Sequence, residues 1–326
     1  MMDVGWLEGL LALTVQVGVL YLLASLGEIY AERSGVLNLG LEGIMIMGAV
    51  ASFVFTNALG HGHALLAAAA FGCGMGLLLA VLTVTMKLNQ IVVGLAMTIM
   101  GYGISGLMGH PSTREHVMRA LNPGIAQEVV MLQRAPPLGA VPVPFLSDLP
   151  LVGRALFEHN VLVYAALVLA FAMWFVLFRT SFGLAVRSVG ENPSMADALG
   201  INVFRLRYVT CAISGTLGGL AGAYLFIGYQ PFWLEMMTNG RGFIALALVI
   251  LASWNPLRAV LGSLLFGGVE VIQYRLQLYG VGAQTPQFVL MLPYVVAIVT
   301  LSLLSVESVR KRIGVPEALG KPYSRE

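Results

Sequence analysis

One apolar stretch, residues 32–49, limits how this chain can fold more than any other segment. It is apolar enough to enter a membrane, yet it holds Asn38 and Glu42 one helical turn apart. The same stretch carries four spaced glycines, Gly35, Gly40, Gly43 and Gly48. A lipid-facing helix would avoid both polar groups, because a carboxylate at the centre of a bilayer costs roughly 2.5–3.5 kcal/mol on insertion scales. We therefore expect the stretch to lie inside a helix bundle or beside a water-filled path.

The composition indicates a membrane protein. Of the 326 residues, 58% are hydrophobic and 10% are charged, whereas a soluble domain carries about 25% charged residues. The formal net charge is +2, and the scattered basic residues form no stripe that would bind nucleic acid. Cys73 and Cys211 lie in apolar runs, so we interpret them as small packing residues rather than a disulfide or a metal pair.

Apolar runs, most of them near the roughly 17–25 residues that cross a bilayer, predict an all-α polytopic membrane protein. A single transmembrane domain over residues 1–326 would hold about nine helices, with eight to ten as the range. Trp254, Asn255 and Pro256 interrupt one long run, which we divide into two shorter helices joined by a tight turn. The expected spans are residues 10–31, 36–58, 64–86, 91–109, 161–178, 208–229, 243–252, 259–273 and 288–305.

The basic residues predict the orientation, because cytoplasmic loops carry an excess of Lys and Arg. We assign the C-terminal tail, residues 306–326, to the cytoplasm and count back through the spans. Twelve of the eighteen basic residues then lie on the cytoplasmic side: Arg33, Lys87, Arg179, Arg187, Arg205, Arg207, Arg258, Arg310, Lys311, Arg312, Lys321 and Arg325. The N-terminus is expected outside, and it lacks the basic region of a cleavable signal peptide.

Two loops outside the spans are long enough to have roles of their own. The predicted outer loop, residues 110–160, holds seven prolines, which exclude a single long helix. It would either dock an external partner or form an irregular solvated cap. The predicted cytoplasmic loop, residues 180–207, contains a short helix over 194–199, with Asn192 as N-cap, Pro193 at the first helical position and Gly200 ending it.

The short helix is expected to expose apolar side chains on the cytoplasmic face. A helix of under two turns is unstable alone in water, so it must pack against something. It would dock into a groove of another protein or, alternatively, connect spans by packing on the chain's own helix ends. We favour docking. The side chains concerned are Met195, Ala196, Ala198 and Leu199.

Other intramembrane features have plainer interpretations. Gly215, Gly218, Gly219 and Gly222 form overlapping GxxxG pairs, which favour close helix packing over a substrate-lining role. Glu28 lies one turn from Glu32 and beside Arg33, so we expect an interfacial ion cluster that caps the bundle rather than a group lining a path. Glu270 and Gln273, near the outer end of the eighth span, are candidates for a gate or a snorkelling pair.

The sequence contains no convincing catalytic, nucleotide-binding or metal-binding motif. Gly101, Gly103 and Gly106 match a dinucleotide fingerprint but lie within a span, where helix packing is the better explanation. We find no nucleophile elbow, no zinc-protease helix and no credible nucleotide loop, and His61 and His63 alone do not predict a metal site. We expect no catalytic residues, no metal and no cofactor in this chain, and hence no enzyme.

Four ordered segments resemble the permease subunits of bacterial ABC importers for branched-chain amino acids, ribose and other simple sugars. The segments are residues 32–49, 187–202, 215–225 and 239–267. The first is most similar to the branch for nucleosides or simple sugars, and to its smaller, NLGLEG-type subunit. The resemblance implies a type II-like importer permease in the bacterial plasma membrane. Its partners would be a separate ATPase that uses the ATP, a second homologous permease in a heterodimer, and an extracytoplasmic substrate-binding lipoprotein.

The resemblance also implies roles for particular residues. The helix that couples to the ATPase would comprise Gly190, Glu191, Asn192, Pro193, Met195, Ala196, Leu199 and Gly200. A broken-helix signature near the path would comprise Asn38, Gly40, Glu42 and Gly43. Separately from the resemblance, the depth of Glu42 in the membrane indicates that it accepts from an N–H at a helix break or meets a polar group of another subunit. Our hypothesis is that Glu42 and Asn38 hold the broken helix open against the partner permease.

Two other functions compete with this reading. An ion-coupled secondary transporter of a small polar solute would place acidic residues at the centre of broken helices, as Glu42 could. The capped cytoplasmic helix counts against it, because such a carrier needs no docking helix. An intramembrane enzyme lacks a catalytic cluster here.

Overall fold

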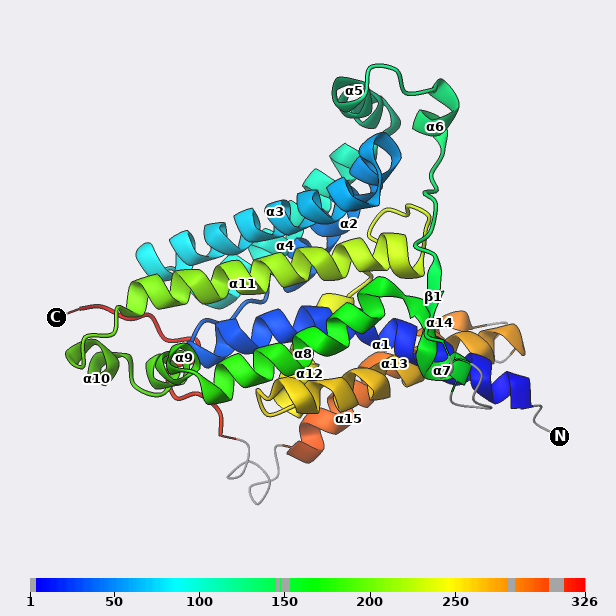
Figure 1. Ribbon diagram of the computed structural model, residues 1–326. Coiled ribbons are helices and arrows are strands. Elements are labelled where there is room, and N and C mark those ends of the chain that lie inside the picture. Colours follow the sequence, from blue (N-terminus) through cyan, green and yellow to red (C-terminus); the bar gives the residue numbers. More distant parts are fainter. Residues whose placement is uncertain (1–3, 145–146, 148–152, 281–284, 305–313, 326) are drawn as a thin grey trace.

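The computed structural model describes residues 4–144, 147, 153–280, 285–304 and 314–325, and they form a bundle of helices (Figure 1). The longer helices are α1 (Val4–Arg33), α2 (Leu41–Leu59), α3 (His61–Ala80), α4 (Gln90–Gly109), α8 (Val161–Arg179), α11 (Val203–Tyr224), α13 (Pro256–Leu278) and α15 (Leu292–Leu304). The shorter ones are α5 (Pro111–Leu121), α6 (Gln127–Met131), α7 (Gly153–Phe157), α9 (Ser181–Glu191), α10 (Pro193–Ala198), α12 (Arg241–Leu251) and α14 (Pro286–Leu290). π-Helical turns, η1 (Val81–Thr85) and η2 (Leu225–Tyr229), extend α3 and α11.

Seven helices in the described ranges are long and apolar enough to cross a membrane. They are α1, α2, α3 with η1, α4, α8, α11 with η2, and α13. The apolar helices at 241–251 and 287–302 are shorter, and they correspond to the two remaining predicted spans. The all-α membrane fold is therefore confirmed, while a total of nine crossings stays a prediction.

The helices form two layers joined by α1 and α11 (Figure 1). In one layer α11 packs on α2 and α3, and α2 also packs on α4. In the other layer α1 packs on α8, α12 and α13. Because α1 and α11 are the central helices of their layers and also contact each other, most of the buried side chains belong to one continuous core.

The glycines of α11 lie where backbones touch. A Cβ atom at Gly215 or Gly219 would overlap carbonyl oxygens of α3, and one at Gly222 would overlap the carbonyl oxygen of Met45 in α2. At Gly218 a Cβ would lie 2.9 Å from the side chain of Leu41. These four positions therefore serve the packing of α11 on α2 and α3, where small residues let helices approach closely in a lipid environment.

Two helices begin in the interior of the bundle. The predicted span 36–58 is wrong at its start, because α2 begins at Leu41, after a turn that contains Asn38. Likewise α12 begins at Arg241, after a non-helical segment that follows η2. Glu42 lies beside Tyr102, midway along α4, and Arg241 contacts Glu270, midway along α13. Both helix starts therefore lie at about half the height of the bundle.

The described residues of the segment 110–160 form short elements rather than one long helix. It holds α5, α6 and α7, and a two-stranded antiparallel pair, β1 (Ala140–Pro142) with β2 (Glu158–Asn160). The prediction that no single long helix fills this loop is confirmed. At the opposite end of the bundle, α9 and α10 lie beside the C-terminal tail (Figure 1). Arg310, Lys311 and Arg312, used above for the orientation, lie outside the described residues.

Candidate functional site

A buried carboxylate holds the turn between α1 and α2. The side chain of Glu28 is fully buried and accepts hydrogen bonds from the Asn38 backbone N–H at 3.2 Å, from Asn38 Nδ2 at 3.1 Å and from Ser214 Oγ at 2.8 Å. The Oδ1 atom of Asn38 accepts from the Gly40 N–H at 3.1 Å and so closes the turn before α2. The expected ion cluster around Glu28 is therefore wrong, because Glu28 binds polar groups of the turn and of α11 instead.

The other two members of that expected cluster have different partners. Glu32 Oε2 accepts from the indole N–H of Trp254 at 2.6 Å. The guanidinium of Arg33 donates to the Trp254 carbonyl at 3.4 Å and to the Ser253 carbonyl at 3.3 Å. Both side chains thus hold the turn between α12 and α13.

Glu42 binds the N-terminus of α12. Its Oε1 atom accepts from the Gly240 N–H and from the Tyr102 hydroxyl, both at 2.8 Å, and its Oε2 accepts from the Gly242 N–H at 2.6 Å. The first N–H groups of a helix have no partner within it and carry partial positive charge, so a carboxylate is a favourable cap. Of the two predicted partners, an N–H at a helix break is the one that the structure contains.

The hypothesis that Asn38 and Glu42 hold the broken helix open against a partner permease stays a prediction, and any such effect would not come from direct contact of these side chains with the partner. Both side chains are fully buried and bind groups of their own chain. Gly43 has a packing role, since a Cβ there would lie 2.5 Å from the Met97 carbonyl oxygen of α4. Gly242 similarly meets the backbone of Glu42, where a Cβ would lie 2.6 Å from its Cα.

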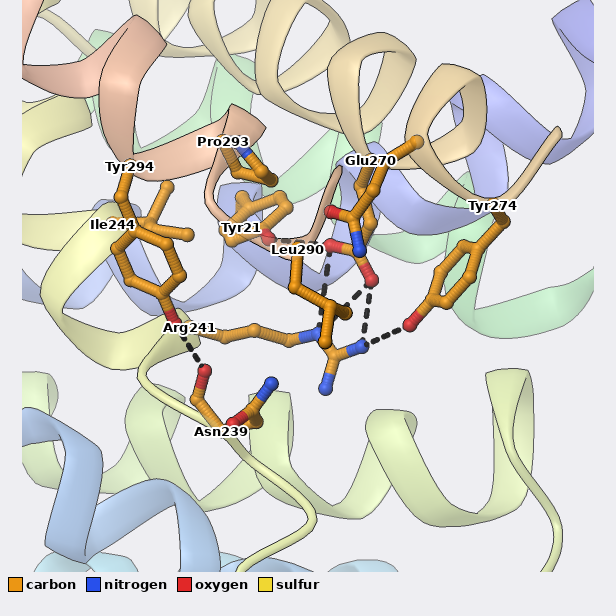
Figure 2. A pocket seen from close by; sticks show the side chains of 10 residues that line it. Tyr21, Asn239, Arg241, Ile244, Glu270, Tyr274, Leu290, Pro293 and Tyr294 are labelled. Atoms are coloured by element: carbon orange, nitrogen blue, oxygen red, sulfur yellow. Dashed lines mark hydrogen bonds and ion pairs between the residues drawn. The ribbon is translucent and has the colours of Figure 1, made fainter. Parts of the chain in front are cut away.

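A buried ion pair lies next to this junction (Figure 2). Arg241 Nη2 lies 2.6 Å from Glu270 Oε1, and both side chains are less than a tenth exposed. The hydroxyl of Tyr21 donates to Glu270 Oε2 at 2.5 Å, and Arg241 Nη2 donates to the Tyr274 hydroxyl at 3.0 Å. Glu270 is therefore no snorkelling residue. The sequence analysis did not predict this pair, because it considered Arg241 only as part of an apolar segment.

The knob formed by α9 and α10 has the local structure expected of it. Asn192 Oδ1 accepts from the Met195 N–H at 3.0 Å, Pro193 is the first helical residue, and Gly200 has φ +87°. The N-cap, the proline position and the glycine end are confirmed. The helix covers Pro193–Ala198, and the 11-residue α9 before it was not predicted.

The knob exposes fewer apolar side chains than expected. Met195 is 61% exposed and Leu199 77% exposed, so both are free to meet another protein. Ala196 was expected to be exposed but is buried against Val189 and Val203. Gly190 is buried too, and a Cβ there would overlap the Arg33 carbonyl oxygen.

The C-terminal tail, residues 314–325, fastens the knob to the rest of the bundle. The Ala318 N–H donates to the Gly190 carbonyl at 2.9 Å, and the Gly320 N–H donates to the Gly35 carbonyl at 3.2 Å. Arg325 Nε lies 2.8 Å from Asp197 Oδ2 of α10. Sequence reasoning used this tail only for its charge, because irregular backbone contacts leave no pattern in a sequence.

Together these features define a class: a multi-pass membrane subunit with two helices that begin inside the bundle, a capped knob at one end, and no candidate metal cluster among the described residues. The comparison with protein families agrees. Residues 10–301 match the family described as "Branched-chain amino acid transport system / permease component". The chain belongs to this family of ABC transporter permeases.

Three relatives match over most of both chains. A Haloferax volcanii protein, provisionally named a glucose ABC transporter permease, is 37% identical over 98% of each chain. The guanosine ABC transporter permease protein of Bacillus subtilis is 34% identical over 93% of this chain and 92% of its own. The nucleoside ABC transporter permease protein of Lactococcus lactis is 36% identical over 86% of each chain. No solved structure matches.

Proposed function

We propose that this chain forms half of the translocation path of an ABC importer for a nucleoside or a simple sugar. The observation that carries the proposal is the knob: a capped α10 that exposes Met195 and Leu199 at one end of a membrane bundle. Family membership gives that knob a partner, the separate ATPase. The relatives named for glucose, guanosine and nucleosides give the two classes of cargo.

The assembly follows from the same proposal. The ATPase docks on α10 in the cytoplasm, and an extracytoplasmic binding protein delivers the solute to the opposite end, where the segment 110–160 lies. A second, homologous permease completes the path in a heterodimer, and nine crossings in a type II-like arrangement put the N-terminus outside. ATP binding to the ATPase then moves α10, and α9 and the tail transmit the movement to the bundle.

The electrostatics at the middle of the bundle support a neutral cargo. The Gly240 and Gly242 N–H groups of α12 are already bound by Glu42, and Arg241 is bound by Glu270. A carboxylate of a branched-chain amino acid would need a free cation or a free helix N-terminus to replace its hydration. A nucleoside or a sugar has no such requirement, which favours it over the amino acids in the family's description.

The first experiment tests the energy source. The chain is reconstituted in vesicles with its ATPase, second permease and binding protein, with ATP inside and ion gradients collapsed by ionophores. Uptake of radiolabelled guanosine or glucose should require internal ATP and persist without gradients. Uptake that does not depend on internal ATP and is lost when the ion gradients are collapsed would show an ion-coupled carrier instead.

The second experiment tests the docking surface. A cysteine at Leu199 should crosslink to the ATPase, whereas a cysteine at Leu261, which is 71% exposed on the membrane-spanning α13, should not. Both variants keep Cys73 and Cys211, so any crosslinking through the native thiols is the same in the two variants. Equal crosslinking at the two positions, or none at Leu199, contradicts the assignment of α10.

A further inference from the structure

A small cavity lies at the start of α12, between α1, α13 and α15 (Figure 2). Its lining combines three tyrosine rings, two carboxamides, one ion pair and three apolar side chains. The ten residues are Tyr21, Asn239, Arg241, Ile244, Glu270, Gln273, Tyr274, Leu290, Pro293 and Tyr294. Glu270 and Gln273 lie one turn apart on α13, so both reach the cavity from the same face of that helix.

One polar side chain that lines the cavity is largely buried. Gln273 is 4% exposed, and its carboxamide makes no hydrogen bond to any residue that the structure describes. An amide that faces a cavity without a protein partner needs water or a ligand to satisfy its hydrogen bonds. The group can donate two hydrogen bonds and accept two, which suits a ligand with hydroxyl groups.

The opposite wall of the cavity supplies a second free carboxamide. Asn239 is exposed and adopts φ +44°, a left-handed conformation that asparagine tolerates better than most residues. Its backbone carbonyl accepts from the Tyr294 hydroxyl at 2.5 Å, which fixes the loop (Figure 2), while its side chain has no partner among the described residues. An exposed amide at mid-bundle would be unfavourable against lipid, so this face borders water or another protein.

The two charged side chains in the cavity lining, Arg241 and Glu270, are paired with each other. Arg241 donates to Glu270, to the Tyr274 hydroxyl and to the Met237 carbonyl at 2.8 Å, and Glu270 also accepts from Tyr21. The charges of Arg241 and Glu270 therefore neutralise each other. The polar side chains of the lining that have no partner among the described residues are those of Asn239 and Gln273. Aromatic rings beside neutral hydrogen-bonding groups are suited to hydroxyl groups rather than to an ion. The cavity volume is about 30 Å³, so it admits hydroxyl groups at the edge of a solute ring and not the whole ring.

We propose that this cavity is a contact point for the solute along the path, where Gln273 and Asn239 hydrogen-bond hydroxyl groups of a neutral ring. The ring is the ribose of a nucleoside or a simple sugar, since both present the same neighbouring hydroxyls. The inference rests on the proposed function and names the residues that touch its cargo. The Arg241–Glu270 pair keeps the start of α12, and with it the cavity wall, in place.

The test uses the complete importer in vesicles, with saturating loaded binding protein, and measures both solute uptake and ATP hydrolysis. Gln273→Met keeps the side-chain length and removes the amide, and Asn239→Gly keeps the backbone conformation and removes the other amide. Each should lower uptake about fivefold to tenfold, the effect of one lost neutral hydrogen bond, with ATP hydrolysis unchanged. The matched control, Gln277→Met, removes an amide one turn further along α13. Its Nε2 atom is buried without a hydrogen-bond partner and lies outside the cavity lining, so this variant tests whether loss of any buried amide of α13 lowers uptake.

Deoxy analogues show whether the amides touch the solute. Guanosine is compared with 2′-deoxyguanosine and 3′-deoxyguanosine, and glucose with 2-deoxyglucose and 3-deoxyglucose, so the two arms separate the two cargo classes. In the unmodified importer at least one deoxy analogue should be taken up more slowly, and in Gln273→Met or Asn239→Gly that difference should disappear. Two results overturn the inference. In the first, a variant slows uptake of the parent solute and of every deoxy analogue by the same factor. In the second, the variants and the unmodified importer take up each solute equally fast.

Two further results keep the outcomes distinct. Failure of one variant to assemble with the ATPase leaves the other variant to decide, because the two amides come from different elements. A fall in uptake and ATP hydrolysis together in both variants shows a structural role and also overturns the inference. An unmodified importer that moves neither guanosine nor glucose is a failure of the proposed function, which the first experiment detects by itself.

Discussion

Glu42 shows how one residue can join two distant parts of a membrane protein. Its two carboxylate oxygens accept from two backbone N–H groups of α12 and from the Tyr102 hydroxyl of α4. A lone carboxylate in the bilayer would be unfavourable, but here it satisfies helix-terminal donors that would otherwise be buried without partners. The same residue therefore explains why α12 can begin inside the bundle.

Replacement of this carboxylate should be destabilising in a graded way. Glu42→Leu removes the acceptor of the Gly240 and Gly242 N–H groups, and each buried donor without a partner costs about 1–3 kcal/mol. Glu42→Gln keeps one oxygen as acceptor and should have the smaller effect. We expect the midpoint of thermal unfolding in detergent to fall by several degrees for Leu and less for Gln. Glu235→Leu, at an exposed carboxylate nearby, is the control, and an unchanged midpoint for Glu42→Leu would contradict the capping role.

Helix α11 illustrates what small residues do at the level of an element. Its glycines face α2 and α3 at distances that admit no side chain, so only glycine fits at these positions of α11. With no hydrophobic drive between helices in lipid, such close backbone contact is a main source of stability. The matching approach of Gly18 in α1 and Gly267 in α13 joins the corresponding helices of the other layer.

Two glycine-to-alanine changes should therefore have opposite results. At Gly222 the new methyl group would overlap the Met45 carbonyl oxygen, so α11 and α2 must separate and the folded subunit should be recovered poorly in detergent. At Gly74 in α3 nothing lies within 4 Å, and alanine should be neutral or stabilising by up to about 1 kcal/mol. The yield of monodisperse protein on gel filtration measures both, and equal yields would refute the packing role of Gly222.

At the scale of the whole molecule, the C-terminal tail joins segments that lie far apart in the sequence. It bonds to α9 through Gly190, to the turn before α2 through Gly35, and to α11 through Arg207, whose Nη1 donates to the Lys321 carbonyl at 3.3 Å. The turn at Gly35 leads directly to Asn38 and Glu28. A displacement of the knob thus has a continuous route to the junction inside the bundle.

Removal of residues 315–326 should weaken this connection without preventing membrane insertion. We expect the truncated subunit to co-purify with less ATPase and to lose most ATP-driven uptake, because α9 and α10 lose their backbone bonds to the tail. Arg325→Ala should change little by contrast, since the pair with Asp197 is exposed on the arginine side and such pairs contribute about 0–1 kcal/mol. Full uptake by the truncated subunit would show that the tail is dispensable.

The sequence alone was sufficient for features whose physical cause is local. Apolar runs predicted the membrane-spanning helices, and Asn192, Pro193 and Gly200 predicted the knob, because hydropathy and capping act within a few neighbouring residues. The same reasoning failed for Ala196, since burial depends on what packs against a helix from elsewhere. It also missed α9, whose amphipathic face is covered by α1 and α8.

Only the tertiary structure decided which buried groups meet. Glu42 lies 198 and 200 residues from the two N–H groups it binds, and Glu28 lies 186 residues from Ser214. No local pattern records such partners, because a carboxylate in a bundle accepts any donor that the packing brings within reach. The sequence determined that these charges need partners inside a membrane, and the packing of α2 against α12 and of α1 against α11 determined which partners they have.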